Sequence, residues 1–328
     1  MKVLIYRILL QIAPNVLFRF QHYLMHSRFG NQRYVANLSE PKTFNEFTLK
    51  QKNALLRESY GSWVDKYAVK NKISEKVGPE ILIPTMKHFN GGKLPEADDI
   101  SFPCILKPTH LSGYTRVFKT KADFYSFDLN SYWGQVSGIN FYHLTGERQY
   151  KAVEPAILFE PLIQDTQHEE LKDYKIFCFG GKPKFIQVDL DRKFNHTRTF
   201  YDLEWSNQRF SSMYPIYEGE VEKPKNLDEM LRIAEELAKP FTFVRVDLYN
   251  VSGKVLFGEL TFDHGSGNEP FTAYEHDLRL GNFYAQALRH EKKAPENYVR
   301  CALIKSWGFR KSRLRIVFLL VKKTRRCC

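Results

Sequence analysis

The sequence contains few cysteines, and none of them is spaced for a disulfide framework or a metal site. The count of five is odd, no Cys-X-X-Cys pair occurs, and no cysteine is grouped with histidine at ligand spacing. Isolated thiols in such a pattern are typical of a reducing compartment. We therefore expect a cytoplasmic protein without structural disulfides. The cysteines are Cys104, Cys178, Cys301, Cys327 and Cys328.

The common motifs of nucleophilic and nucleotide-binding enzymes are also missing. No GxSxG, P-loop or GxGxxG occurs in a usable context, and no Ser/His/Asp or Cys/His arrangement follows from spacing. His110, His196 and His264 lie beside polar loop segments, and no pair has HxxxH spacing. We interpret them first as loop residues and second as substrate contacts.

No apolar run is long enough to span a bilayer. The N-terminal stretch MKVLIYRILLQIAPNVLFRF is interrupted by Arg7 and Gln11, and no small-residue cleavage site follows it. This pattern favours an amphipathic helix over a signal peptide. Near the other end, the run from Leu314 to Val321 is interrupted by Arg315 and is far shorter than a transmembrane helix requires.

Acidic residues are scarce at the C-terminal end, where nearly all of the net charge is found. Residues 289–328 contain 13 Lys or Arg and 2 Asp or Glu, so they carry +11 of the total +12. Such a basic amphipathic tail could lie on an anionic membrane surface. It could equally be a solvated tail or a helix docked on the body. We expect no nucleic-acid partner, because no aromatic-interleaved basic sheet or DNA-reading motif is visible.

The hydrophobic periodicity indicates an α+β protein with a largely antiparallel sheet. Residues 1–60 look helical, with a turn at Pro41, and another helix is expected from about residue 62 to Gly78. Further on, Gly180-Gly181 marks a hairpin. The sequence also predicts strands at 81–84, 102–108 and 156–163 and a helix at 226–240.

The stretch FVRVDLYNVSGKVLFGELTF, residues 243–262, reads as two strands joined by a turn. If Asn250 faces Lys254, Arg245 faces Glu259 and Asp247 is its diagonal neighbour, with Cβ atoms about 7 Å apart. Two carboxylates at that distance can share Mg²⁺, and the arginine can offset their charge. The alternative is an ordinary exposed Arg–Glu pair with a separate aspartate.

Two other segments carry polar residues at positions where a ligand could bind. Lys107 ends a strand and is followed by THLSGY, and such a loop can hold phosphate oxygens through its backbone N–H groups. In the hairpin at Gly180-Gly181, pairing of Ile176 with Val188 would place a polar row on one face. That row would be either a solvated face or the floor of a ligand cleft, and it comprises Asp173, Lys175, Gln187, Asp189 and Asp191.

Several segments, taken in their order along the chain, resemble the TupA-like branch of the ATP-grasp family. They are PKTFNEFTLKQK, DKYAVKNKISEKVGPEILIP, FPCILKPTHLSG, ILFEPLI, DYKIFCFGGKP, YDLEW, FVRVDLYNVSGKVLFGELTF and GSG, and together they cover about residues 38–285. The resemblance implies two α+β subdomains that clasp ATP. It divides the chain into an N-terminal helical region (1–60), an ATP-grasp region (61–288) with a lid at about 85–165 and a core at about 166–288, and the basic tail (289–328).

The resemblance also implies roles for individual residues. Lys66 and Lys107 would contact ATP phosphates, and Ser112 and Gly113 would belong to the loop over them. Glu160 to Leu162 would border adenine, with the Leu162 N–H as donor because Pro161 has none. Lys175 would face nucleotide or substrate. The remaining implied site residues are Asp247 and Glu259 as Mg²⁺ ligands and Arg245 as partner of the transferred phosphoryl group.

The activity implied by the resemblance is ATP-dependent joining of a carboxylate to an amine through an acyl phosphate. The branch is associated with bacterial cell-surface polysaccharides, which suggests glycan substrates at the inner membrane face. One departure concerns Thr261, since many ATP-grasp enzymes carry Asn at that position, so a second Mg²⁺ is in doubt. A kinase or glycosyltransferase using the same cleft, or a non-catalytic nucleotide-binding scaffold, remains open.

Overall fold

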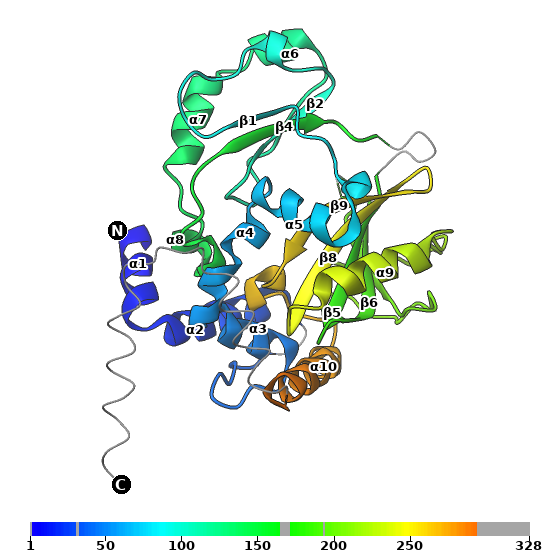
Figure 1. Cartoon of the computed structure of the whole chain (residues 1–328). Helices are drawn as coiled ribbons and strands as arrows, with labels where there is room; N and C mark the ends of the chain where they lie inside the picture. Colours follow the sequence, from blue (N-terminus) through cyan, green and yellow to red (C-terminus); the bar gives the residue numbers. More distant parts are fainter. Residues whose placement is uncertain (1, 31–32, 165–170, 193, 294–328) are drawn as a thin grey trace, which may run out of the picture. The chain divides into compact units, whose positions relative to one another are not determined.

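The computed structural model describes residues 2–30, 33–164, 171–192 and 194–293 (Figure 1). The chain divides into two units, Met1–Glu291 and Lys292–Cys328, and only the first is described below. Nearly all of the basic tail therefore lies outside the described residues. Every sheet pairing within the described ranges is antiparallel, which confirms the expected α+β class.

The first sheet has four strands in the order β1-β4-β2-β3. Its core contains Phe159 from β4 together with Val136 from α7, both fully buried. The sheet is formed by β1 (Lys87–Phe89), β2 (Cys104–Pro108), β3 (Arg116–Phe118) and β4 (Ile157–Pro161), with α6 (Lys121–Tyr125) and α7 (Leu129–Ser137) packed on it.

The second sheet has five strands in the order β7-β6-β5-β8-β9. One face is covered by α9 (Leu227–Ala238), whose Met230, Ala234 and Leu237 are fully buried against Ile176 and Val246 of the sheet. Spacing of three and four residues places those α9 side chains on one helical face. The strands are β5 (Asp173–Phe179), β6 (Lys182–Leu190), β7 (Thr197–Tyr201), β8 (Phe243–Val251) and β9 (Lys254–Thr261).

The opposite face of this sheet is aromatic at one end and polar at the other. Phe177, Phe200 and Phe243 pack there against Phe44 of α3 and Tyr284 of α10. A packed aromatic cluster fixes the strands beside it, because such side chains bury a large area. The polar half, described below, is therefore held on a rigid support. The two helices are α3 (Phe44–Lys52) and α10 (Tyr274–Lys293).

The N-terminal region is helical, as its sequence predicts. Thr43 and Glu46 form a reciprocal capping box at the start of α3. None of the helices in the described part of the chain is long and apolar enough to cross a membrane. The long helices of this region are α1 (Lys2–Ile12) and α2 (Pro14–Phe29), and short helices elsewhere include η1 (Leu55–Tyr60), η3 (Ala97–Asp99), α8 (Tyr142–Thr145), η4 (Arg148–Tyr150) and η5 (His264–Gly267).

Two predicted elements differ from the structure. The helix expected from residue 62 to Gly78 is split into α4 (Gly61–Val64) and α5 (Ala68–Val77), because the Asp65 carboxylate accepts hydrogen bonds from the backbone of Tyr67 and Ala68. The strand expected at 81–84 is also wrong. Pro79 instead begins the short helix η2 (Pro79–Ile81), and the first strand starts at Lys87.

The register of the β5–β6 hairpin also differs from the predicted one. Ile176 faces Ile186, not Val188, because the turn contains only two residues and a bulge follows at Phe177 and Cys178. Gly180 and Gly181 have φ values of 56° and 78°, which glycine adopts without strain. The shift is by two residues, so the predicted polar face is preserved.

Candidate active site

Two carboxylates lie directly opposite each other on β8 and β9. Asp247 faces Glu259 and Arg245 faces Thr261. The predicted register, with Arg245 opposite Glu259, is wrong because the two-residue turn and a bulge at Gly258 shift the pairing. A Cβ atom at Gly258 would lie 2.9 Å from the carbonyl oxygen of Asp247, so the close approach suits glycine. In the observed register the two acids lie closer together than the predicted diagonal arrangement would place them.

Arg245 holds this pair of acids together. Its guanidinium donates to both oxygens of Asp247 at 2.7 and 2.6 Å, and Nη2 lies 3.5 Å from Glu259 Oε1. The guanidinium also donates to Thr261 Oγ1 at 3.0 Å and to His264 Nδ1 at 2.8 Å. The site thus contains a buried cation between two anions, which lowers the repulsion between them.

The two carboxyl groups differ in exposure and in acidity. Burial raises the pKa of Asp247 to about 6, although Arg245 and Lys175 act in the opposite direction. Burial acts on Glu259 as well, but Lys66 and Arg245 outweigh it and lower the pKa of Glu259. The Glu259 side chain is 46% exposed, whereas that of Asp247 is 4% exposed. Glu259 is therefore the more accessible ligand of the two.

Lys175 lies on the neighbouring strand β5, opposite Asp247. Its ammonium group pairs with Asp173 and lies 3.7 Å from both Asp189 and Asp247. These four side chains are buried, so the reading of this face as solvated is wrong. Of the predicted row, Gln187 is also buried on the same face, while Asp191 lies beyond the end of β6.

A further set of ion pairs continues this polar face, and it was not predicted from the sequence. Arg198 on β7 donates to Asp189 at 2.6 Å and to Glu269 at 2.7 Å. Glu269 Oε2 lies 3.1 Å from Nε2 of His264, which is itself bound to Arg245. Burial alone would raise the pKa of Glu269, but His264 and Arg198 lower it. The chain of contacts therefore extends from the carboxylate pair to the edge of the sheet.

The four-stranded sheet carries a second charged group, centred on Glu160. Glu160 is buried, and its two oxygens bind Lys70 Nζ at 2.5 Å and Lys107 Nζ at 2.8 Å. Lys70 was not predicted as a site residue. The available signal was its position one helical turn after Lys66 in the expected helix.

Lys66 connects the charged groups of the two sheets. Burial lowers its pKa, and the charges acting on it include Glu259 of β9, Lys107 and Glu160 of the four-stranded sheet, and the neighbouring Asp65. Its ammonium group donates to Leu111 O at 2.5 Å, in the loop after β2. Lys66 is therefore within electrostatic range of both Glu259 and Lys107.

The loop after β2 is exposed at its tip. Ser112 and Gly113 are exposed, and Gly113 and Tyr114 have φ values of 79° and 59°. A left-handed conformation at a non-glycine residue is uncommon and is often found in functional loops. Nothing lies within 4 Å of a Cβ atom placed on Gly113, so the loop has room on that side.

The predicted adenine donor is engaged elsewhere in this structure. The Leu162 N–H donates to Pro103 O at 3.1 Å, which extends the pairing of β2 with β4. Backbone groups alternate sides along a strand, so the next N–H on the opposite side belongs to Ile163, since Pro161 has none. Within the described residues, the Ile163 N–H donates to no backbone oxygen of a neighbouring turn or loop.

The side-chain oxygen atoms on β8 and β9 are of the kind that bind Mg²⁺. Asp247 and Glu259 offer two carboxylates, and Thr261 adds a hydroxyl 3.4 Å from Glu259 Oε1. In the part of the chain that the structure describes, no three His, Cys, Asp or Glu side chains are grouped as a metal site. Mg²⁺ is commonly held by one or two carboxylates plus substrate phosphates and water, so two are sufficient.

Solved structures of ATP-grasp ligases are similar to this chain at low identity. D-alanine–D-alanine ligase from Bacillus anthracis shares 17% identity, with a TM-score of 0.42, over 75% of this chain and 79% of that one. The ATP-grasp ligase PsnB complexed with a minimal precursor shares 11% identity, with a TM-score of 0.37, over 72% and 63%. A search of curated proteins finds no significant match.

The sequence profile of one protein family matches most of this chain. The profile of the TupA-like ATP-grasp family matches residues 46–285, close to the range over which the sequence resembles that family. This range contains both antiparallel sheets and the charged groups that they carry. The chain therefore belongs to the TupA-like ATP-grasp family and is an enzyme of the ATP-grasp ligase class.

Proposed function

We propose that this protein joins a carboxylic acid to an amine at the expense of ATP, through an acyl phosphate. The observation that carries the proposal is the direct pairing of Asp247 with Glu259 beside Arg245, in a region that Lys66 links to Lys107. Transfer of a phosphoryl group depends on positioning and on cations, not on a protein nucleophile. This agrees with the sequence, whose spacing indicates no nucleophilic triad.

Each charged group has a role in this proposal. Asp247 and Glu259 would hold Mg²⁺, which neutralises phosphate charge when it is bound. Lys66 and Lys107 would bind phosphate oxygens, and we add Lys70 because it shares Glu160 with Lys107. The exposed loop at Ser112 and Gly113 would cover the phosphates. Arg245 and Lys175 would orient the reacting carboxylate and stabilise negative charge on the transferred group.

The four-stranded sheet would act as the lid and the five-stranded sheet as the core. This proposal keeps the division at about 85–165 and 166–288 that the resemblance implies. The adenine edge would contact the strand end after Glu160, and we assign the donor to the Ile163 N–H, since the Leu162 N–H is bound to Pro103. The hinge would then lie where β4 ends.

The family membership supports a proposal for the substrate class. The TupA-like branch is associated with cell-surface polysaccharides, so we propose a uronic acid or a similar glycan carboxylate as acceptor and an amino compound as the amine. We propose a bacterial cytoplasmic enzyme, because its thiols are not spaced for disulfides and glycan precursors are made there. The basic tail at residues 289–328 would bring it to the inner membrane face.

An isotope experiment tests the proposed reaction. When the acceptor carboxylate is labelled with ¹⁸O, an acyl phosphate passes one labelled oxygen to the phosphate released by the amine. We expect ADP and singly labelled phosphate when uronic acids and amino acids are screened together with MgATP. A phosphorylated sugar without free phosphate would identify a kinase instead, and would contradict the ligase proposal.

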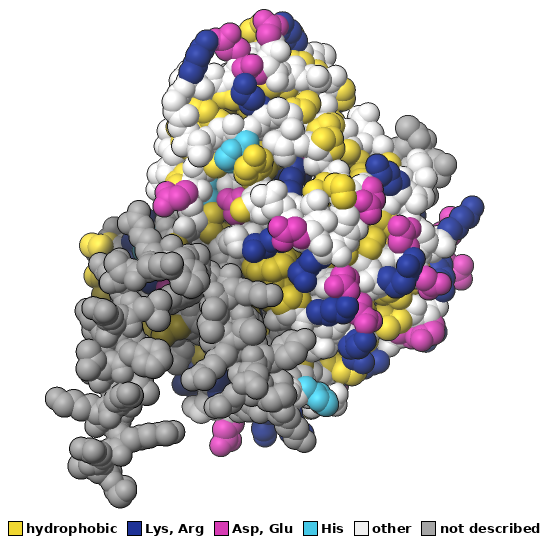
Figure 2. Space-filling view, viewed as in Figure 1, with side chains coloured by type: hydrophobic (Ala, Val, Ile, Leu, Met, Phe, Trp, Pro, Cys, Tyr) yellow, Lys and Arg dark blue, Asp and Glu magenta, His cyan; other side chains and the backbone are white. Residues whose placement is uncertain are grey.

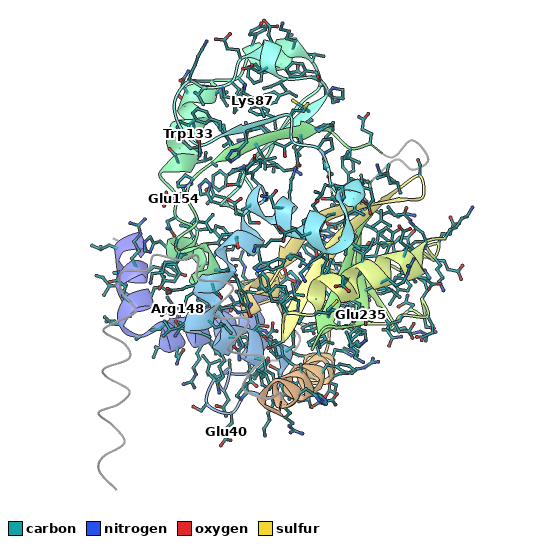
Figure 3. The ribbon with its side chains drawn as sticks, viewed as in Figure 1. Glu40, Lys87, Trp133, Arg148, Glu154 and Glu235 are labelled. Carbon is teal, nitrogen blue, oxygen red and sulfur yellow. The ribbon has the colours of Figure 1, made fainter. Side chains whose placement is uncertain are left out.

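Variants connect that reaction to the site. Asp247→Asn and Glu259→Gln should lower Mg²⁺-dependent ADP release by about 100-fold or more, because each removes one charged ligand of the cation. Glu235→Gln, on α9, is the matched control, and its exposed carboxylate pairs with Lys182 (Figure 3). Equal activity in all three variants would remove the two carboxylates from the mechanism.

A further inference from the structure

A row of exposed apolar side chains runs along the first two helices. Large hydrophobic residues are exposed at every fourth position of the chain from residue 4 to residue 24. Residues four apart lie on the same face of a helix, so each helix carries one apolar stripe. Ten of the seventeen exposed large hydrophobic residues in the described ranges fall between Leu4 and Val35. The apolar stripe consists of Leu4, Ile8, Ile12, Val16, Phe20 and Leu24.

The stripe is not required for the packing of these helices. Leu10 of α1 and Leu17 and Phe18 of α2 are buried in a separate cluster with Leu49 of α3 and Tyr142 of α8. Both helices are therefore already anchored through their other faces. Contiguous apolar patches are rare on soluble monomers and mark sites of interaction.

The stripe borders a shallow groove beside α2. The groove has a volume of about 280 Å³ and is lined by Val16, Phe20, Tyr23 and Val35, with Arg19 as its one charged residue. Phe20 and Val35 are more than half exposed, and Tyr23 is 41% exposed. Apolar side chains beside Tyr23, whose ring carries a polar hydroxyl, suit the boundary between lipid headgroups and acyl chains.

The charge of residues 1–39 indicates which partner fits the apolar stripe. No Asp or Glu occurs before Glu40, whereas the first 39 residues contain five Lys or Arg. Arg7 and Arg19 are exposed beside the apolar stripe. A second copy of the same surface would bring like charges together, which disfavours a symmetric dimer. An anionic lipid surface complements both the cations and the apolar stripe.

We propose that α1 and α2 form a membrane-binding surface that lies in the interface of an anionic bilayer. Interfacial helices of this kind carry an apolar face with basic residues beside it and do not cross the membrane. The proposal concerns this surface alone and does not depend on the chemistry of the ATP site. It also assigns membrane binding to a part of the chain separate from the basic tail.

Vesicle binding by the full chain tests this proposal. We expect the protein to float with vesicles of equal parts phosphatidylglycerol and phosphatidylcholine, and to bind vesicles of phosphatidylcholine alone more weakly. The double variant Ile12→Glu, Phe20→Glu should bind the anionic vesicles at least about tenfold more weakly, because two carboxylates replace apolar contacts. Arg7→Gln combined with Arg19→Gln should reduce the preference for anionic lipid.

Matched controls separate this surface from general hydrophobicity and from the tail. Leu55→Glu and Tyr125→Glu change equally exposed apolar residues elsewhere and should leave vesicle binding unchanged. All variants retain residues 289–328, and thermal unfolding shows whether each one folds. Undiminished binding by the double variant would assign membrane binding to the tail alone and overturn the proposal. A wild-type dimer that does not bind vesicles and that the double variant dissociates would also overturn it.

Discussion

At the residue scale, the site is organised by arginine and lysine side chains that already have acidic partners. Arg245 contacts both members of the carboxylate pair, and Lys175 lies between Asp173, Asp189 and Asp247. A buried charge without a partner is costly, and each of these buried acids has a cationic partner in the absence of a ligand. An entering cation would have to compete with Arg245 for Asp247, whereas Glu259 is half-exposed and available.

The lysine group gives a prediction at the same scale. Lys107→Met should weaken binding of MgADP by about 10- to 100-fold, because a charge-assisted hydrogen bond to phosphate contributes about 1.5–3 kcal/mol. Titration calorimetry measures the effect directly. Lys87→Met is the control, since Lys87 lies on β1 of the same sheet and pairs with the exposed Asp99 (Figure 3). Equal affinities for the two variants would exclude Lys107 from the nucleotide site.

At the element scale, the bulge at Gly258 determines which residues of β8 and β9 face each other. Gly258→Ala should lower the free energy of unfolding by about 1–3 kcal/mol, because its Cβ atom would press on the Asp247 carbonyl. It should also weaken binding of MgADP by displacing Glu259. Denaturant unfolding and calorimetry measure the two effects. Gly134→Ala in α7, where a Cβ atom meets nothing within 4 Å, should not destabilise the protein.

Helix α2 gives a prediction about acid stability. His22 is buried and stacks on His26 at 3.9 Å, and burial together with His26 lowers the pKa of His22 to about 3. Between that value and the ordinary value of about 6.5, the unfolded chain binds a proton that the folded chain does not. The free energy of unfolding should therefore fall as the pH falls below about 6.5.

The variant His22→Phe should reduce this acid sensitivity. Its melting temperature should change less than that of the native chain between about pH 7 and about pH 5. His290→Gln, which alters an exposed histidine of α10, should keep the native pH dependence. Identical pH profiles for His22→Phe and the native chain would show that another group causes the loss of stability.

The sequence was sufficient to predict most element types and the two polar strands, since period-two alternation by itself marks Arg245, Asp247 and Glu259. It was not sufficient to predict their register. One extra residue in a bulge and a two-residue turn changed the partner of Asp247, and neither has a distinct hydrophobic signal. The role of Glu160 as partner of Lys70 and Lys107 depends on contacts between separate elements, which periodicity does not report.

At the scale of the whole molecule, we propose that the two sheets carry two parts of one site. Glu259 of the five-stranded sheet and Lys107 and Glu160 of the four-stranded sheet all act on the pKa of Lys66. Away from the site, Lys or Arg and Asp or Glu side chains are interspersed on the surface around α9 (Figure 2). Such a mixed surface is ordinary for a soluble face, whereas the charged side chains of the candidate site are paired and largely buried.

The central claim is that Asp247 and Glu259 bind one divalent cation together with the phosphates of ATP. A crystal structure with Mn²⁺ and a non-hydrolysable ATP analogue tests it through the anomalous signal of the metal. We expect a metal peak at about 2.0–2.3 Å from an oxygen of each carboxylate, with Lys107 on a phosphate. A bound nucleotide with its metal elsewhere, and Asp247 and Glu259 still paired only with Arg245, would contradict the account.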